Sequence, residues 1–181
     1  SITQFLEKRL KVKVNPDKTK VGSSLRLKFL GFSLGVDHNG AYARPAKQSQ
    51  QRVKKALRLL TKRNRGISLT RMFEEIQRKM RGWLQYYSIG KLTDFIQRLD
   101  KWLRARIRQY IWKQWKKLKT KVTNLQKLGL SQRDAYVFAS TRKGYWRTAH
   151  SKTLSYSLTN RKLEQLGLMN MSKTLQSIQC D

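Results

Sequence analysis

Basic and aromatic side chains recur at helical spacing near the middle of the chain, and their chemistry suits the binding of a polyanion. At about 100° per residue, five of them fall on one side of a predicted helix, opposite its apolar stripe: Arg98, Lys101, Arg108, Trp112 and Lys116. Cations at this spacing can follow a phosphate backbone, and an aromatic ring among them can stack on a base. A solvated charged face is the plainer alternative, but the local excess of positive charge favours nucleic acid.

Two further segments carry similar side chains. The helix predicted to begin after Pro45 presents a less specific cationic surface, made by Arg52, Lys54, Lys55, Arg58, Lys62, Arg63 and Arg65. A basic and aromatic loop nearer the C-terminus contains Arg142, Lys143, Tyr145, Trp146 and Arg147. These loop side chains could bind RNA or DNA through stacking and charge, or Trp146 could instead anchor the loop to the protein core.

The charge balance points to the same class of partner. The chain has 181 residues, with 41 Lys and Arg against 10 Asp and Glu, and a net charge of +31. Residues 46–125 alone carry 23 basic and 4 acidic side chains, so we predict that this middle part binds the polyanion. A hydrophobic content of 39% excludes a disordered basic tail, and no apolar run is long enough to cross a membrane.

Few residues of the chain suit metal binding. A single cysteine, Cys180, excludes a disulfide framework and a zinc site built on paired cysteines. His38 lies in a predicted turn and His150 follows the basic loop, so we interpret both as structural or exposed to solvent. We therefore predict no metal site and no cofactor bound by this chain.

The elements expected before residue 46 are short. Apolar residues at helical spacing predict a helix over 2–10, and the alternation over 25–29 predicts a half-buried strand. Gly31 interrupts this alternation, which indicates a bulge or a close approach of the backbone to another group. The turn over 37–40 ends in Asn-Gly and predicts a hairpin, whose return strand closes at Pro45.

Helices dominate the rest of the chain. Apolar periodicity over 46–121 predicts a bundle of three helices, the second capped by Ser68 and the third by Thr93. Shorter capped helices are predicted over 134–140 and 161–166. The sequence therefore predicts a mainly α fold in which a small β-hairpin precedes a three-helix bundle and a small helical C-terminal region.

Four segments, taken in order along the chain, resemble one protein family. Lys13-Val14-Asn15-Pro16-Asp17-Lys18-Thr19 and Leu27-Lys28-Phe29-Leu30-Gly31-Phe32 resemble the last two sequence blocks of a reverse-transcriptase palm in group II intron-encoded proteins. Residues 76–87, which contain Arg81-Gly82-Trp83-Leu84-Gln85-Tyr86-Tyr87, resemble the start of the thumb, or maturase, domain of the same family. Residues 142–149 resemble the signature of the segment beyond the thumb.

This resemblance covers nearly the whole chain and implies the C-terminal part of a group II intron reverse transcriptase and maturase. The implied architecture is the end of the palm over 1–45, an α-helical thumb over 46–121, and a small helical DNA-binding region over 122–181. Such a protein binds its intron RNA to assist splicing, and it grips a template–primer duplex for reverse transcription and intron mobility. The alternatives are the thumb of a non-splicing, retron-like reverse transcriptase and a purely structural RNA-binding protein.

The resemblance also implies roles for residues that precede the helices. Lys18 matches a palm lysine that could protonate departing pyrophosphate as a general acid, or it could be a turn lysine exposed to solvent. A hairpin that resembles the primer grip contains Arg26, Lys28, Phe29, Gly31 and Phe32. In that hairpin the glycine would let the backbone approach the end of a strand, the two cations would contact phosphates, and the phenylalanines could pack in the core.

The catalytic carboxylates implied by the family lie in a Tyr-x-Asp-Asp motif upstream of Lys18, and no two aspartates are adjacent in this sequence. Because two-metal nucleotidyl transfer needs clustered carboxylates, we expect this chain to be inactive alone. We expect Mg²⁺ at the upstream polymerase site and in the intron RNA. The expected partners are group II intron RNA, a template–primer RNA/DNA duplex, target DNA and the N-terminal reverse-transcriptase portion of the same protein, with no membrane. The expected location is intracellular, in a bacterial cytoplasm or an organelle.

Overall fold

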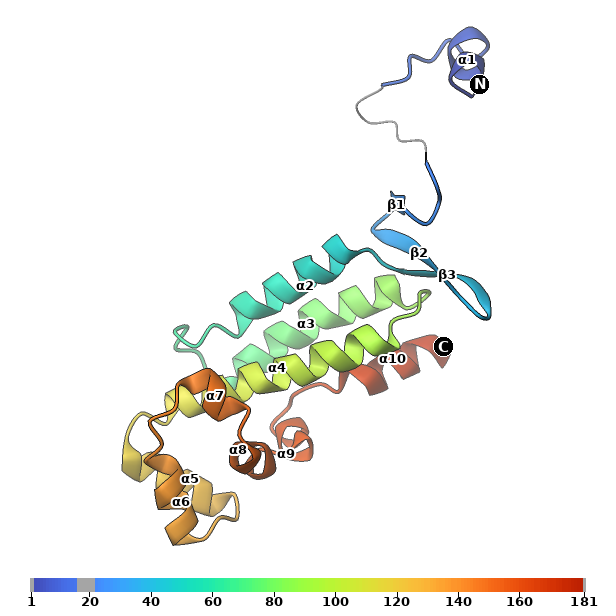
Figure 1. Cartoon of the computed structure of the whole chain (residues 1–181). Helices are drawn as coiled ribbons and strands as arrows, with labels where there is room; N and C mark the ends of the chain where they lie inside the picture. Colours follow the sequence, from blue (N-terminus) through green and yellow to red (C-terminus); the bar gives the residue numbers. More distant parts are fainter. Residues whose placement is uncertain (1, 16–21, 181) are drawn as a thin grey trace.

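The computed structural model describes residues 2–15 and 22–180, and its elements are mostly helices (Figure 1). This confirms the predicted mainly α fold with a small β-sheet ahead of the helices. In chain order the elements are α1 (Ile2–Lys8), β1 (Lys28–Phe29), β2 (Phe32–Asp37), β3 (Gly40–Pro45), α2 (Lys47–Leu60), α3 (Leu69–Tyr87), α4 (Thr93–Gln114), α5 (Leu118–Lys127), α6 (Gln132–Ala139), α7 (Tyr145–Ala149), α8 (Lys152–Ser157), α9 (Asn160–Gln165) and α10 (Met171–Cys180).

The three strands form one antiparallel sheet in the order β1-β2-β3. Asp37 pairs with Gly40 across the second turn, as the Asn-Gly sequence predicted. The first turn joins Phe29 to Phe32 through Leu30 and Gly31, whose φ angles are 48° and 79°. Two consecutive positive φ values are typical of a tight hairpin turn that follows the twist of its strands.

The half-buried strand predicted over 25–29 is wrong in length and in burial. β1 contains only two residues, and both are exposed. Phe29 is 77% exposed and Leu25 is 50% exposed, so alternation did not bury this side of the chain. Alternation buries a side chain only where a second layer covers that face, and β1 is an edge strand of a small sheet.

Gly31 joins the sheet to the helical part of the chain. A Cβ atom placed on it would lie 2.5 Å from the hydroxyl oxygen of Tyr87, which ends α3, and 3.2 Å from Oγ of Ser49 in α2. The Ser49 hydroxyl also donates a hydrogen bond of 3.0 Å to the carbonyl oxygen of Gly31. The close approach that the sequence indicated at this glycine is therefore confirmed.

We expect Gly31→Ala to destabilise the chain by about 2 kcal/mol, because the new methyl group meets the Tyr87 hydroxyl and the positive φ disfavours a side chain. Urea unfolding measures this loss. Gly82→Ala is the matched control, since a Cβ atom at Gly82 within α3 meets nothing within 4 Å. That control should be neutral or slightly stabilising, and an equal loss in both variants would contradict the expectation.

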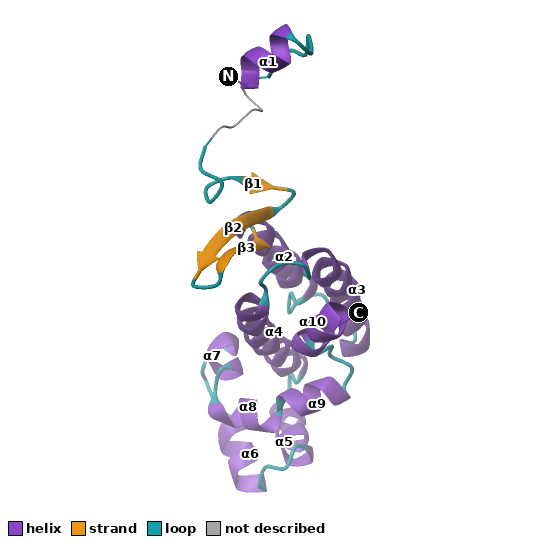
Figure 2. Ribbon diagram, turned by 90° about the vertical axis from the view of Figure 1, so that its right-hand side faces the viewer, coloured by secondary structure: helices purple, strands orange, loops and turns teal. Residues whose placement is uncertain are grey.

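Helices α2, α3 and α4 lie side by side, and α10 returns from the C-terminal end to pack against α3 and α4 (Figures 1 and 2). The predicted three-helix bundle therefore gains a fourth helix. Buried side chains from all four elements share one apolar cluster, represented by Leu57, Ile76, Leu103 and Leu175. Because this burial joins residues far apart in the sequence, the C-terminal helix helps to hold the bundle in place.

Within the bundle, the predicted helix ends are correct in one place and wrong in two. The Ser68 hydroxyl accepts from the backbone N–H of Arg71 and so begins α3, as predicted. Thr93 does not cap α4, whose N-cap is Leu92. The third helix was expected to run towards Lys121, but α4 ends at Gln114 and α5 starts at Leu118.

Candidate nucleic-acid interface

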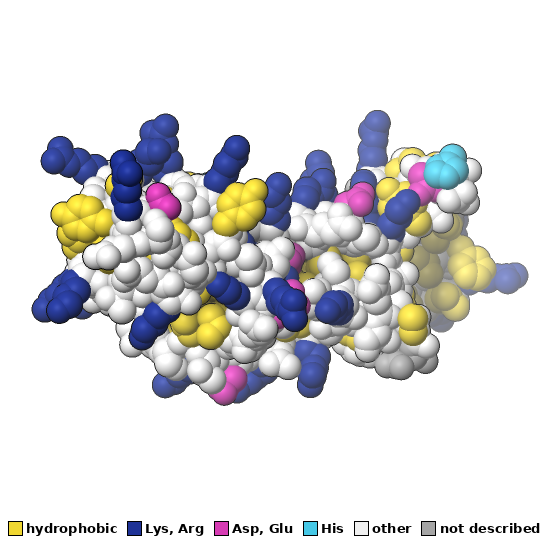
Figure 3. All heavy atoms as spheres, turned by 90° about the horizontal axis from the view of Figure 1, so that it is seen from below, with side chains coloured by type: hydrophobic (Ala, Val, Ile, Leu, Met, Phe, Trp, Pro, Cys, Tyr) yellow, Lys and Arg dark blue, Asp and Glu magenta, His cyan; other side chains and the backbone are white. Residues whose placement is uncertain are grey.

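Lys and Arg side chains are spread along the face of the molecule seen in Figure 3, with few Asp and Glu side chains among them. Charge alone therefore does not single out one binding surface. A stronger criterion is the place where cations meet partly accessible aromatic rings on a rigid element, since that combination can hold both phosphates and bases. Helices α2 and α4 supply such a place.

Trp102 of α4 lies at the centre of this surface. Lys54 Nζ of α2 is 5.2 Å from the centroid of its ring, and Cζ of Arg106 is 5.8 Å away. A cleft of about 410 Å³ runs beside the ring between the two helices, with Arg98 and Phe95 also on its wall. The tryptophan is half-buried, so part of its ring stays accessible between cations from two helices.

Arg106 is held in a fixed position. Its Nε donates to Oγ1 of Thr61 over 3.0 Å, and its Nη2 donates to the carbonyl oxygens of Arg58 and Thr61 over 3.0 and 3.1 Å. Burial lowers the pKa of Arg106, and the neighbouring cations Arg58 and Arg63 lower it further. An arginine stays protonated in proteins, so this site concentrates positive charge that a phosphate would stabilise.

Tyr145 of α7 extends the surface towards the C-terminal region. Cζ of Arg63 lies 5.0 Å from its ring centroid, and Lys113 Nζ lies 5.5 Å from it. We call the whole surface the α2–α4 face and define it by Lys54, Arg58, Arg63, Arg98, Trp102, Arg106, Lys113 and Tyr145. Three of these, Trp102, Arg106 and Lys113, were missed as site residues from the sequence. Their helical spacing to Arg98 was the available signal.

The basic and aromatic loop over 142–147 is partly helical, since α7 starts at Tyr145. Tyr145 is the half-buried ring of this segment, whereas Trp146 is 42% exposed and forms a T-shaped contact with the ring of His150, with 4.3 Å between centroids. Trp146 is therefore not the anchor that the sequence offered as an alternative. Arg142, Lys143 and Arg147 are exposed, which keeps them available to a nucleic acid.

The prediction that Trp112 lies on the exposed basic side of α4 is wrong. Its side chain is 2% exposed and packs against Phe138 of α6, with 5.3 Å between ring centroids. Lys121 of α5 lies over the same ring at 4.7 Å. Helices α5 and α6 cover the end of α4, so Trp112 cannot stack on a base in this conformation.

Arg108 is also engaged by the protein. Its Nε donates to the carbonyl oxygen of Leu158 over 3.0 Å, and its Nη2 donates to Oδ1 of Asn160 over 3.3 Å. Burial lowers the pKa of Arg108, with a further lowering from Arg104. The predicted phosphate ligand thus fastens α4 to the segment around α9. The other members of the predicted set, Arg98, Lys101 and Lys116, are exposed as expected, together with the α2 cations Arg52, Lys55, Arg58, Lys62 and Arg63.

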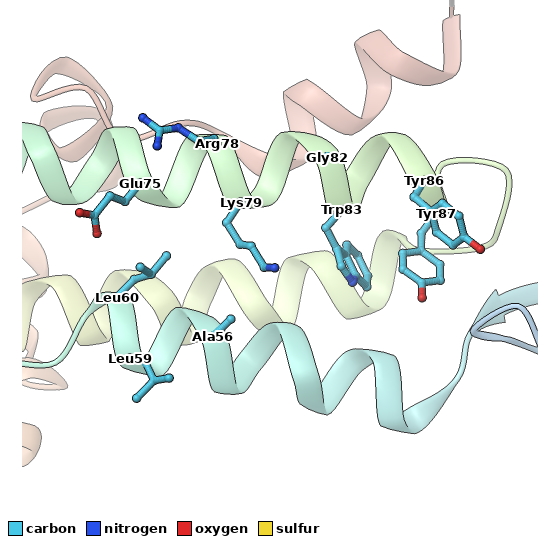
Figure 4. A pocket seen from close by; sticks show the side chains of 10 residues that line it. All are labelled: Ala56, Leu59, Leu60, Glu75, Arg78, Lys79, Gly82, Trp83, Tyr86 and Tyr87. Carbon is cyan, nitrogen blue, oxygen red and sulfur yellow. The ribbon is translucent and has the colours of Figure 1, made fainter.

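A second surface lies between α2 and α3, where a groove of about 740 Å³ opens to solvent (Figure 4). Leu59 and Leu60 of α2 form one wall, and Trp83 and Tyr86 of α3 form one end of the groove. Lys79 extends from α3 towards α2, and the charged side chains of Glu75 and Arg78 also line the groove. We call this surface the α2–α3 groove.

The groove reaches the hairpin that resembles a primer grip. The hydroxyl of Tyr86 donates to the carbonyl oxygen of Leu30 over 2.9 Å, and the rings of Tyr87 and Phe32 are 4.9 Å apart. Gly31 and Phe32 are half-buried at this junction. The remaining residues of the predicted grip, Arg26, Lys28 and Phe29, are exposed, and Lys28 Nζ donates to the side-chain carbonyl of Gln48. Lys18 lies outside the described residues.

A known protein family matches the part of the chain that runs from α2 through α5. Residues 50–129 match the family model of the group II intron maturase-specific domain. The chain carries a maturase domain. This confirms the resemblance over residues 76–87, which lie within the match, and it supports a maturase role in group II intron splicing with intron RNA as the partner. No curated protein matches the chain.

The maturase domain contains most of the α2–α4 face and of the α2–α3 groove, since the match runs from within α2 to the glycine that follows α5. Tyr145 is the one member of the α2–α4 face outside the match. Over residues 2–15 and 22–180, no helix is long and apolar enough to cross a membrane. The same residues contain no group of three or more His, Cys, Asp or Glu side chains that could hold a metal ion.

Proposed function

We propose that the maturase domain binds structured intron RNA through the α2–α4 face. The observation that carries this proposal is the position of Trp102 between Lys54 and Arg106, which come from two helices. Phosphates would contact the cations, while the accessible part of the ring would pack on a base or a sugar. Rigid contacts of this kind stabilise one RNA fold over others, and the chemistry of splicing stays with the RNA and its Mg²⁺.

We further propose that the α2–α3 groove and the adjoining hairpin hold a template–primer duplex. The bond from Tyr86 to Leu30 supports this proposal, because it fixes the primer-grip-like turn at the end of the groove. Polymerisation would need the N-terminal reverse-transcriptase portion, where Lys18 and the Mg²⁺-binding carboxylates would act. Intron mobility would add target DNA as a partner of the C-terminal region, in a bacterial cytoplasm or an organelle. The maturase match disfavours a retron-like thumb and a purely structural RNA-binding protein.

A competition assay at about 0.2 M salt tests the first proposal, because non-specific phosphate contacts weaken at that ionic strength. The labelled ligand is a folded group II intron RNA, and the competitors are scrambled RNA of equal length and an RNA–DNA hybrid duplex. We expect scrambled RNA to compete at least about tenfold less well than the intron, which is about 1.4 kcal/mol. Equal competition by all three ligands would contradict an intron-specific surface in this chain.

A further inference from the structure

A pocket outside the maturase domain combines features that suit a nucleobase. It has a volume of about 570 Å³ and is lined by residues of α6, of the segment that leads into α7, and of α8. Val137 and Phe138 of α6 and Leu130 form its apolar wall, and Tyr156 of α8 also lines it. Such a pocket is large enough for a flat aromatic ring and mostly apolar, as ligand sites usually are.

Two side chains of this pocket, one aromatic and one aliphatic, are largely exposed to solvent. Tyr156 is 77% exposed and Val137 is 67% exposed. An aromatic ring and an apolar side chain that meet at the same pocket offer the surfaces on which a base can stack. The ring of Tyr156 is therefore free to contact a ligand from the solvent side.

Polar groups in the same pocket could recognise the edge of a base. Asp134 accepts from the Ser131 hydroxyl over 2.7 Å through its Oδ2, which leaves its Oδ1 for an amino group. Thr153 contributes a hydroxyl that can donate or accept a hydrogen bond. A carboxylate accepts from the exocyclic amino group of cytosine, so this edge favours bases that carry such a group.

The surroundings of the pocket are complementary to phosphate. Lys143 lines the pocket itself, and Asp134 is the one acidic side chain among residues 131–157. The other cations of that segment are all exposed: Arg133, Arg142, Arg147 and Lys152. A ligand with an aromatic base and a phosphate backbone satisfies both the pocket and its rim.

We propose that this pocket, which we call the α6–α8 pocket, binds an unstacked nucleobase of a single-stranded nucleic acid. The base stacks on Tyr156, its amino group donates to Asp134, and its phosphates contact Lys143 and the cations around it. A base within a duplex cannot enter, because its faces are covered by its neighbours. This site goes beyond RNA binding by the α2–α4 face, and it shares no residue with that face.

The experiment measures binding of the full chain to a short oligodeoxycytidine and to an abasic strand of equal length and charge. Tyr156→Ala should weaken binding of oligodeoxycytidine by about tenfold and leave binding of the abasic strand unchanged. The dependence on salt should stay the same, because the substitution removes no charge. An oligocytidine RNA forms a second arm, and a loss confined to DNA or to RNA identifies which strand the pocket accepts.

Tyr136→Ala is the matched control, because Tyr136 is a tyrosine of α6 that is 57% exposed but does not line the pocket. It should change binding of neither strand. An equal loss on the abasic strand, an equal loss in Tyr136→Ala, or no loss in Tyr156→Ala would overturn the proposal. None of these results bears on the α2–α4 face, since Tyr156 is not part of it and the ligand is not the intron RNA.

Discussion

Replacing Lys54, Arg58 and Arg63 by alanine should weaken the binding of group II intron RNA and lower the slope of log K against log salt by about two to three. The slope counts the cations that displace counterions from phosphates, at a little less than one unit for each. All three side chains belong to the α2–α4 face, where Arg58 and Arg63 lower the pKa of Arg106 by their charge. Filter binding over a series of salt concentrations measures both quantities.

The control removes the same charge from other surfaces. Lys127, Arg161 and Lys173 are exposed side chains of α5, α9 and α10, and their replacement by alanine leaves an equal net charge. If the α2–α4 face holds the RNA, the control should keep most of the affinity and lose less than one unit of slope. Equal losses in the two variants would mean that the protein binds RNA through its total charge and not through this face.

Local rules predicted the second hairpin turn and the start of α3. The turn before Gly40 follows from Asn-Gly, and the start of α3 follows from the hydroxyl of Ser68. In both cases the hydrogen bond or φ angle that sets the conformation involves residues only a few positions apart in the chain. A short stretch of sequence is therefore enough to predict the turn and the helix start. The mainly α class was predictable for the same reason, since apolar periodicity is a local pattern.

The sequence could not show which side chains of α4 remain accessible to solvent in the folded chain. A helical wheel separates one face from another, but it does not say which later segment returns to cover each face. In the structure α5 and α6 cover Trp112, whereas Trp102 stays partly accessible beside Lys54. The predicted exposure was therefore correct for Arg98 and wrong for Trp112, although the sequence placed both on the same side of the helix. Contacts between distant residues decide this difference.

The same limit applies to Arg104, which no pattern in the sequence distinguished from the other cations of the helix. Its side chain is 4% exposed, and it forms ion pairs with Asp100 of α4 and Glu164 of α9 over 2.6 and 3.1 Å. Its Nη1 also donates to the carbonyl oxygen of Asn160 over 3.2 Å. This arginine joins the central helix of the bundle to the chain that leads into α10.

We expect Arg104→Ala to destabilise the chain by about 3 kcal/mol, as measured by urea unfolding. Removing one member of a buried ion pair leaves the partner charges without compensation, which costs more than the pair contributed. The unpaired carboxylate of Asp100 should contribute most to this loss of stability, because its side chain is only 16% exposed and its Oδ1 has no hydrogen-bond donor among the described residues. Arg98→Ala on the exposed side of the same helix should change stability by no more than about 0.5 kcal/mol.

A second set of variants identifies the cause of the loss. If unpaired carboxylates destabilise Arg104→Ala, then adding Asp100→Asn and Glu164→Gln should recover part of the lost free energy, because neutral amides are less costly to bury. If the loss came only from missing side-chain packing, the two amides would recover nothing. A loss below about 1 kcal/mol in Arg104→Ala would contradict the role of this ion-pair network. Helix α10 packs on α3 and α4 through buried side chains such as Leu175. If Arg104→Ala weakens the attachment of the chain that leads into α10, this helix should detach locally more often. We therefore expect its backbone amides to exchange faster, before the whole bundle unfolds.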